Sequence, residues 1–323
     1  AFPVSQPFAV INRYPAPMST VLALSIPFFA LVFLGMFARS IGFITQEGAL
    51  TLSKFAFFIA LPPMMFVNVA AGNPADILNW GFVWRYELAT IVIFVAAALL
   101  ARPSFGLSRV ESGMFGLNVA YPNYGYMGVP LAIMAFGNAA ALPLALMLFA
   151  DTIILLMLTA GFVVGNGGGL MTAMWRTLVT MAKNPLLISV LAGLGFAASG
   201  LTMPAALDTI LGMLAASAAP VALFAVGATV YGQPVARAIP EIGSISIARL
   251  ILHPALVAAL FLLVPGQDII WIQTAILASC LPVAANVFVL SSHYGSYAGR
   301  SASAILVSTI LASFTVPVVL YLL

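Results

Sequence analysis

Long stretches of this chain carry no charged side chain. They cover residues 14–38, 55–75, 112–150, 152–175, 184–207, 209–236, 269–299 and 301–323. About 20 apolar residues span a bilayer as an α-helix, and most of these stretches are long enough. Only 6% of the 323 residues are charged, 63% are hydrophobic and the mean hydropathy is +1.16, whereas soluble domains carry roughly 25% charge. The sequence therefore excludes a soluble protein and predicts a polytopic, all-α membrane protein.

The remaining composition narrows the function classes. The net charge of +3 comes from 11 basic residues spread over loops and helix ends, which argues against a nucleic-acid-binding surface. The one cysteine, Cys280, excludes an intrachain disulfide and a thiolate metal cage. With only two histidines, His253 and His293, a histidine metal site is not expected either. We therefore expect no metal and no cofactor.

Breaks at glycine, proline and charge divide the chain into ten predicted spans. They lie near 19–38, 48–71, 82–101, 112–137, 140–164, 185–203, 207–232, 244–264, 269–294 and 300–322. The basic residues near the ends of odd-numbered spans are Arg39, Lys54, Arg102, Arg109, Arg176, Lys183, Arg237 and Arg300, while Arg13 and Arg85 fall on the opposite side. Since cytoplasmic loops are enriched in Lys and Arg, both termini are predicted to face away from the cytoplasm, in a cell (inner) membrane.

The two halves of the chain resemble each other. Prolines recur in order at nearly constant separation: Pro27 and Pro185 are 158 residues apart, Pro63 and Pro220 are 157 apart, and Pro122 and Pro282 are 160 apart. Asp151-Thr152-Ile153 also matches Ser308-Thr309-Ile310. Because each half has five spans, the second half must enter the membrane in the opposite orientation. This predicts an inverted repeat, which is typical of alternating-access transporters.

The predicted domain organisation follows from this repeat. Residues 1–17 form an N-terminal tail, 18–164 the first five-helix repeat and 185–323 the second. The stretch from 165 to 184 begins with glycines that lack the Gly-Lys-Ser/Thr ending of a phosphate-binding loop. Leu170, Met174, Leu178 and Met181 recur there at helical spacing, which predicts a short amphipathic helix on the cytoplasmic membrane surface.

Spans four and nine are predicted to be broken near mid-membrane. Span four contains Pro122, Gly125, Gly128 and Pro130, and span nine contains Pro282 in Ser279-Cys-Leu-Pro-Val-Ala-Ala-Asn286. Proline removes a backbone donor and glycine disfavours the helix. If the breaks meet, two half-helix N-termini converge there, with Asn123 and Asn286 beside them. Such ends carry positive partial charge and free N–H groups, so they favour an anionic substrate.

Charged residues inside the spans are the other candidates. Asp151 is the acid that we expect deep inside a span, and its burial permits a proton-carrying role; it would otherwise pair structurally with Lys54 or a hydroxyl. Lys54 starts span two, where it could support the site or extend to the interface. Arg249 and His253 share one face of span eight. Their expected distance from the breaks favours a structural role.

These motifs resemble the auxin efflux carrier family, including its bacterial malonate-carrier-like members. The matching segments are Tyr121-Pro-Asn-Tyr-Gly-Tyr-Met-Gly-Val-Pro-Leu131, Lys183-Asn-Pro-Leu186, Leu223-Phe-Ala-Val-Gly227 and Leu281-Pro-Val-Ala-Ala-Asn-Val-Phe-Val-Leu290 with Tyr294-Gly295. The resemblance implies ten helices with crossing, broken helices four and nine, as in bile-acid/sodium symporters, and an elevator-like motion, often in a dimer. It also implies a small organic anion such as auxin or malonate, bound at Pro122, Asn123, Tyr124, Gly128, Pro130, Pro282 and Asn286. The long cytoplasmic loop of the plant carriers is missing, which favours a bacterial-type member.

Three alternatives stay open at this stage. A sodium-coupled organic-anion symporter on the same fold is the nearest, although no carboxylate lies between Glu111 and Asp151 or after Asp268. An intramembrane aspartyl enzyme would need two deep acids, and only Asp151 is expected there. A channel would not require an inverted repeat with broken helices. The sequence favours a secondary transporter, coupled to a proton, to sodium or to neither.

Overall fold

The computed structural model describes residues 17–72, 79–163, 182–233 and 238–323, together with residues 169, 175 and 179. The predicted tail at 1–17, apart from Pro17, and most of the predicted linker helix at 165–184 lie outside the described residues. Within those residues the chain forms helices and no strand. The first half contains α1 (Met18–Ser40), α2 (Gln46–Phe55), η1 (Ala56–Ala60), α3 (Leu61–Ala70), α4 (Trp80–Phe105), α5 (Arg109–Ala120), η3 (Tyr124–Gly128), α6 (Val129–Phe136), η4 (Gly137–Ala140) and α7 (Ala141–Val163).

The second half forms a further series of helices. It contains α9 (Pro185–Ser199), α10 (Ala205–Val230), α11 (Ile239–Ile247), η5 (Ala248–Leu252), α12 (His253–Leu263), α13 (Ile269–Ser279), α14 (Ala285–His293) and α15 (Ala298–Leu322). Both series include a helix interrupted at mid-length, α5–η3–α6 in the first half and α13–α14 in the second.

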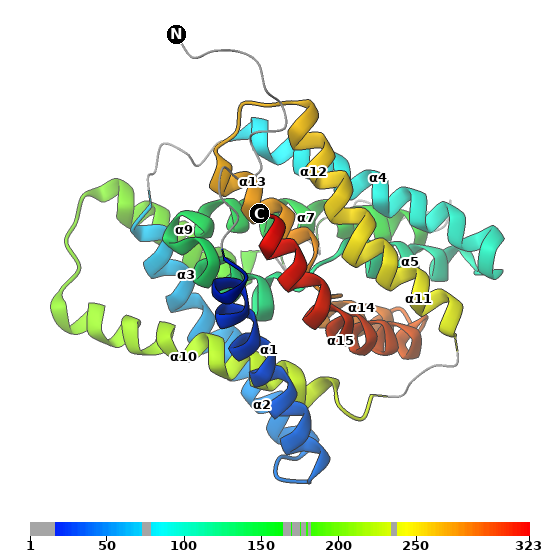
Figure 1. The fold of residues 1–323 in the computed structure, drawn as a ribbon, viewed down its shortest axis with the longest axis horizontal. Coiled ribbons are helices and arrows are strands. Elements are labelled where there is room, and N and C mark those ends of the chain that lie inside the picture. The colour runs from blue at the N-terminus through cyan, green and yellow to red at the C-terminus, as the bar shows by residue number, and fades with distance from the viewer. Residues whose placement is uncertain are drawn as a thin grey trace.

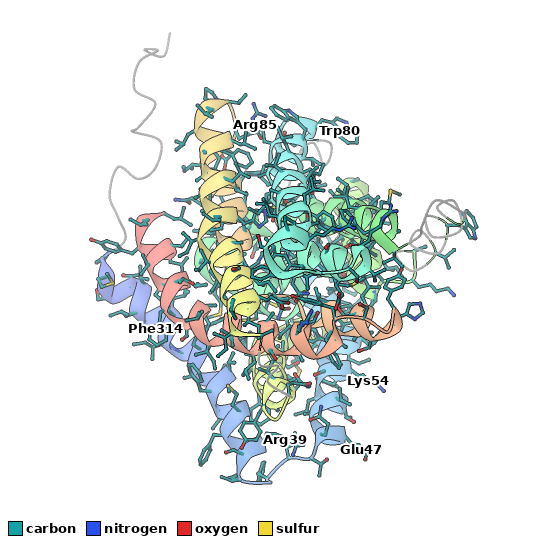
Figure 2. The ribbon with its side chains drawn as sticks, turned by 90° about the vertical axis from the view of Figure 1, so that its right-hand side faces the viewer. Arg39, Glu47, Lys54, Trp80, Arg85 and Phe314 are labelled. Carbon is teal, nitrogen blue, oxygen red and sulfur yellow. The ribbon has the colours of Figure 1, made fainter. Side chains whose placement is uncertain are left out.

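Seven helical stretches in the described part of the chain are long and apolar enough to cross a membrane. Large apolar side chains cover their outer surfaces; Trp80 and Phe314, for example, are each 70% exposed (Figure 2). Water would disfavour such a surface, whereas lipid accommodates it. The prediction of an all-helical membrane protein is confirmed. Arg39 and Glu47 lie at one end of the molecule and Arg85 at the other (Figure 2).

The helices form two groups (Figure 1). In the first group, α1 packs on α10, and α3 packs on α9 and α10. In the second, α4 packs on α5, α7 and α12, while α15 packs on α11 and α14 and also contacts α1 of the first group. The first group is held by a very close crossing of α1 and α10, because Gly35 and Gly227 lie against the backbone carbonyls of Phe224 and Val32, respectively.

Each of three π-helical turns directly precedes a proline in the next helix. The turns are η1, η3 and η5, and the prolines at the second position of the following helix are Pro62, Pro130 and Pro254. Proline has no backbone N–H and crowds the preceding turn, so the hydrogen-bond register widens there. Such π-turns often occur at functional sites. In this chain η3 and η5 both lie at the crossing of the broken helices.

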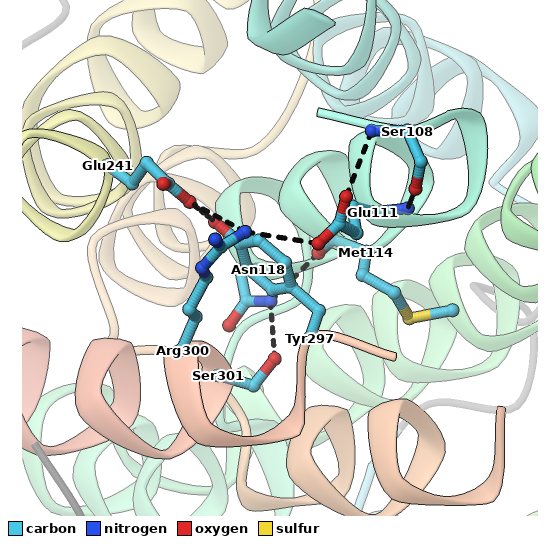
Figure 3. A network of polar contacts seen from close by, with 8 residues as sticks. All are labelled: Ser108, Glu111, Met114, Asn118, Glu241, Tyr297, Arg300 and Ser301. Carbon is cyan, nitrogen blue, oxygen red and sulfur yellow. Dashed lines mark hydrogen bonds and ion pairs between the residues drawn. The ribbon is translucent and has the colours of Figure 1, made fainter. Parts of the chain in front are cut away.

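A polar network joins the starts of α5, α11 and α15 (Figure 3). Arg300 lies 3.2 Å from Glu111 and 3.4 Å from Glu241, and the Tyr297 hydroxyl donates to Glu241 at 2.7 Å. Glu111 also accepts from the backbone N–H of Ser108 in a capping box. The backbone hydrogen bond from Ser108 lowers the pKa of the Glu111 carboxyl. The network therefore connects α5, the first half of one broken helix, to α11 and α15.

Candidate functional site

The two broken helices meet through their unwound backbones. The backbone N–H of Asn123 donates to the Pro282 carbonyl at 3.0 Å, and the N–H of Ala284 donates to the Tyr121 carbonyl at 3.1 Å. Pro122 and Val283 thereby form an isolated antiparallel bridge. These bonds satisfy backbone groups that hydrocarbon would leave without partners. The prolines predicted to break spans four and nine do so, and the breaks lie side by side.

A small cavity opens at this crossing. It is lined by Phe57, Tyr121, Pro122, Asn123, Tyr124, Gly125, Tyr126, Leu148, Asn184, Leu186, Ala284, Ala285 and Asn286. These residues carry no formal charge. The downstream helix segments η3 and α14 both begin here, so the first N–H groups of each segment lack an intrahelical acceptor. The cavity volume is about 30 Å³, which is room for about two water molecules.

The structure brings four of the predicted site residues to the cavity wall: Pro122, Asn123, Tyr124 and Asn286. The Asn123 side-chain oxygen caps η3 by accepting from the Tyr126 N–H at 3.3 Å. Its amide nitrogen has no hydrogen-bond partner among the described residues. Asn286 lies in the first turn of α14 and is exposed. Both amides are therefore free to donate to a bound molecule.

The other three predicted substrate residues, Gly128, Pro130 and Pro282, pack next to the crossing but outside the cavity wall. Gly128 lies so close to Leu281 that a Cβ on it would approach the leucine side chain to 3.0 Å. Pro130 is buried in the first turn of α6. Pro282 supplies the carbonyl that Asn123 binds. They shape the backbone and do not line the cavity.

Arg249 holds the opposite side of the crossing. The expectation that it lies away from the breaks is wrong: the side chain is fully buried among the ends of both upstream half-helices. Its guanidinium donates to the carbonyls of Val119 at 3.1 Å, Ala120 at 2.9 Å and Leu281 at 2.8 Å, with a longer contact to Ala278 at 3.4 Å. The C-terminal ends of α5 and α13 carry negative partial charge. Arg249 therefore neutralises both.

His253 extends this network from the next turn. Its Nδ1 lies 2.8 Å from the Arg249 guanidinium, and its Nε2 lies 3.2 Å from the Thr90 hydroxyl. Arginine only donates hydrogen bonds, so Nδ1 must accept and the proton of the neutral ring must be on Nε2. Nε2 then donates to Thr90, which leaves the Thr90 hydrogen free for another acceptor. The predicted shared face of Arg249 and His253 is confirmed by their contact.

Asp151 lies in the same buried region. It is completely inaccessible, and its Oδ2 accepts from the Tyr124 hydroxyl at 2.5 Å. Tyr124 in turn contacts the Tyr86 hydroxyl at 2.6 Å. The partner of Asp151 is thus a hydroxyl and not Lys54. Lys54 is exposed in the last turn of α2 and does not line the cavity, and its supporting role stays a prediction.

A second buried acid was missed from the sequence. Glu87 on α4 is 4% exposed, and its carboxyl group lies within hydrogen-bonding reach of Asp151. The expectation that only one acid lies deep in the protein is therefore wrong. In the sequence Glu87 follows Arg85-Tyr86 near the start of its span and looks like a residue of the membrane interface. The described residues contain no group of three His, Cys, Asp or Glu side chains that could hold a metal ion.

Comparison with known proteins gives the family. The model of the membrane transport protein family matches residues 20–175 and 170–320. The chain belongs to this family, the auxin efflux carrier family that its motifs resemble. It is 34% identical to a Rhizobium meliloti protein named "Putative malonate transporter", over 95% of this chain and 97% of that protein. An "Uncharacterized transporter" of Methanothermobacter thermautotrophicus is 25% identical over 93% of this chain and 96% of its own length.

The chain is also 22% identical to the "Uncharacterized transporter YfdV" of Escherichia coli, over 92% of this chain and 95% of that protein. These relatives match the chain along almost its whole length. The chain is therefore a multi-pass membrane transporter with a small-molecule substrate. Its relatives are named as transporters and not as enzymes, although a second deep acid is present.

Proposed function

We propose that the chain is a secondary transporter that moves a small organic anion of the malonate type across the cell membrane. The observation that carries this proposal is the cavity at the crossing. Two helix N-termini and two free amides, on Asn123 and Asn286, face it, and no acidic side chain lines it. Positive partial charge and N–H donors together favour a carboxylate. The name of the Rhizobium meliloti relative supports a dicarboxylate such as malonate.

Transport by this site requires movement, since a cavity with room for about two waters cannot hold a dicarboxylate. An elevator-like motion is supported by the two helix groups. In this proposal the group of α1, α2, α3, α9 and α10 is the scaffold, and the other group carries the crossing and the anion. A homodimer through the scaffold would hold it still in the membrane.

The proposed fold is a ten-helix inverted repeat, with residues 18–164 and 185–323 as its two five-helix units and 165–184 as the linker after the tail 1–17. Support comes from the matching interruptions and from the last helix of each unit. On α7, Asp151 binds Tyr124 beside the first break; on α15, the Ser308 hydroxyl accepts from the Val283 N–H at 3.1 Å in the second. The fold would then be that of the bile-acid/sodium symporters, with both termini outside the cytoplasm.

Sodium coupling is the nearest alternative, and Arg249 argues against it at the crossing. In broken-helix transporters, unwound carbonyls and half-helix C-termini commonly coordinate the sodium ion. Here the Arg249 guanidinium takes the carbonyls of Val119, Ala120 and Leu281. A fixed cation thus occupies the position where a sodium ion would bind. This favours a proton as the coupling ion, with Asp151 as its candidate site.

Uptake into proteoliposomes tests the proposal. Labelled mono- and dicarboxylates would be offered to the purified protein under imposed proton or sodium gradients, and we expect saturable uptake of malonate or a close analogue. Asn123→Ser keeps a capping oxygen on η3 but removes the amide donors. Asn286→Ala removes the amide donors of α14, where Asn286 does not cap the helix. Both variants are expected to lose uptake while melting like the parent protein.

The matched control is Asn68→Ala. Asn68 is buried, and among the described residues its amide bonds to the Met64 carbonyl of its own helix at 2.7 Å, outside the cavity. Normal uptake by both crossing variants, or equal loss in the Asn68 variant, would remove the crossing as the substrate site.

A further inference from the structure

The acid pair Glu87–Asp151 has too few hydrogen-bond donors. Both oxygens of Glu87 and Oδ1 of Asp151 are buried and have no hydrogen-bond partner among the described residues. Asp151 receives the Tyr124 hydroxyl on Oδ2 and has the Thr90 hydroxyl nearby, whereas no donor reaches Glu87 from the described residues. Two deprotonated carboxylates offer only acceptors to each other. A proton held between the two carboxyl groups is therefore the hydrogen bond that this arrangement can make.

The charges around the pair support one bound proton. The ionisable groups that face it are Tyr86 on the same helix as Glu87, Tyr124 on η3, and Arg249 and His253 on η5 and α12; Tyr121 and Cys280 lie farther out. His253 accepts from Arg249 and is therefore neutral. Arg249 neutralises the helix C-termini. The half-helix N-termini at the cavity add about one positive charge in total. One carboxylate beside one carboxylic acid balances that charge.

We propose that Glu87 and Asp151 form a proton-binding site in which the two carboxyl groups share one resident proton and take up a second when an anion enters the cavity. An arriving anion adds negative charge near the site, and protonation of the remaining carboxylate cancels one unit of it. The step breaks one O–H bond of a hydronium ion and forms one on the pair, with water as the by-product. Release of the anion on the other side returns the proton. The transporter is then a proton–anion symporter.

Tyr124 connects the pair to the cavity. It lines the cavity wall, and its hydroxyl bonds to Asp151 on one side and to Tyr86 on the other. η3 also carries the helix end that would bind the anion. Any shift of η3 on anion binding would change the Tyr124–Asp151 hydrogen bond directly. The arrangement thus links anion occupancy to the protonation of the pair by a single side chain.

The bound proton can be tested without a substrate. Infrared spectra of the purified protein at neutral pH should contain the carbonyl stretching band of a protonated, buried carboxyl group. We expect this band to be lost in Glu87→Gln and Asp151→Asn, which keep the size of each side chain. Glu241→Gln is the control, because Glu241 is also buried but already accepts from the Tyr297 hydroxyl and forms an ion pair with Arg300. A band that survives in both pair variants would overturn the proton site.

Coupling is tested in proteoliposomes with malonate as the probe, and this part rests on the proposed function. Wild-type protein should accumulate malonate under an inside-alkaline pH gradient and acidify the lumen, as reported by a trapped pH dye. In Glu87→Gln the remaining uptake should no longer depend on the gradient. Gradient-dependent uptake in that variant would overturn the coupling role. Absence of any malonate movement by the wild type, with the infrared band present, would instead refute malonate as the substrate.

Discussion

Arg249 provides the strictest test of the crossing. Arg249→Met keeps an unbranched side chain of similar length but removes every donor from a site with no exposed surface. The guanidinium serves the carbonyls of Val119, Ala120 and Leu281 at 2.8 to 3.1 Å and His253 Nδ1 at 2.8 Å. Hydrogen bonds from a charged donor contribute about 1.5–3 kcal/mol each. Their simple sum would rival the whole stability of a typical domain, so relaxation must recover part of it.

Loss of one member of a buried charged network typically costs about 3–5 kcal/mol, which is the value we adopt for Arg249→Met. At about 2–4 °C per kcal/mol, the melting temperature in detergent should fall by on the order of 10 °C. Arg249→Lys keeps the charge but not the planar fork that reaches both helix ends, so its loss should be intermediate. Arg102→Met, on an exposed arginine in the last turn of α4, is the control. Equal melting of the Arg249→Met and Arg102→Met variants would refute the reasoning.

Two further outcomes follow from the packing and the polar network. Gly227→Ala would place a Cβ on the Val32 carbonyl, so we expect a large loss of thermal stability. The control is Gly212→Ala on the same helix. Its Cβ would meet no atom within 4 Å, so this variant should be neutral or stabilising by up to about 1 kcal/mol. The pKa of Glu111 is lowered in the fold, so its stabilising effect is complete above about pH 4.3, the ordinary value, and disappears as the pH falls through the lowered value. Melting temperatures of wild type and Glu111→Gln should therefore differ at pH 7 and converge in acid, and a difference that is constant with pH would contradict this. Equal melting of the Gly227→Ala and Gly212→Ala variants would contradict the close packing of α1 on α10.

The sequence predicts the parts of the fold that local chemistry controls. Proline and glycine disfavour a helix most where they cluster, so the interruption at Pro122 could be located without a structure, and the repeat pointed to its counterpart at Pro282. Single prolines such as Pro27 and Pro220 lie inside continuous helices. Long apolar stretches identify membrane helices in the same way. The pairing of the two breaks needed one more premise, the repeat of prolines at constant separation. Asn123 and Asn286 were found because they stand next to those prolines.

The sequence did not reveal the partners of the buried charges. Arg249 binds backbone carbonyls more than 100 residues before it and about 30 residues after it, and a carbonyl acceptor has no sequence signature. Glu87 is two residues from Arg85 and therefore resembles a pair at the membrane surface. Only the packing of α4 against α7 places its carboxyl beside Asp151. A side chain that acts through tertiary contacts appears in the sequence as one charged residue without a motif. Near a helix end, such a residue is equally consistent with a position at the membrane surface.

The scarcity of charge takes on a different meaning once the ends of the broken helices are counted. Each half-helix end at the crossing carries about half an elementary charge. Two C-terminal ends meet at Arg249, so one guanidinium cancels both. The two N-terminal ends at the cavity have no counter-charge among the residues that line it, and the one negative charge proposed for Glu87 and Asp151 lies behind Tyr124. An arginine on the far side of the crossing thus leaves the cavity electropositive. An anion can then be attracted without an ion pair at the site, and a weakly held substrate is easier to release.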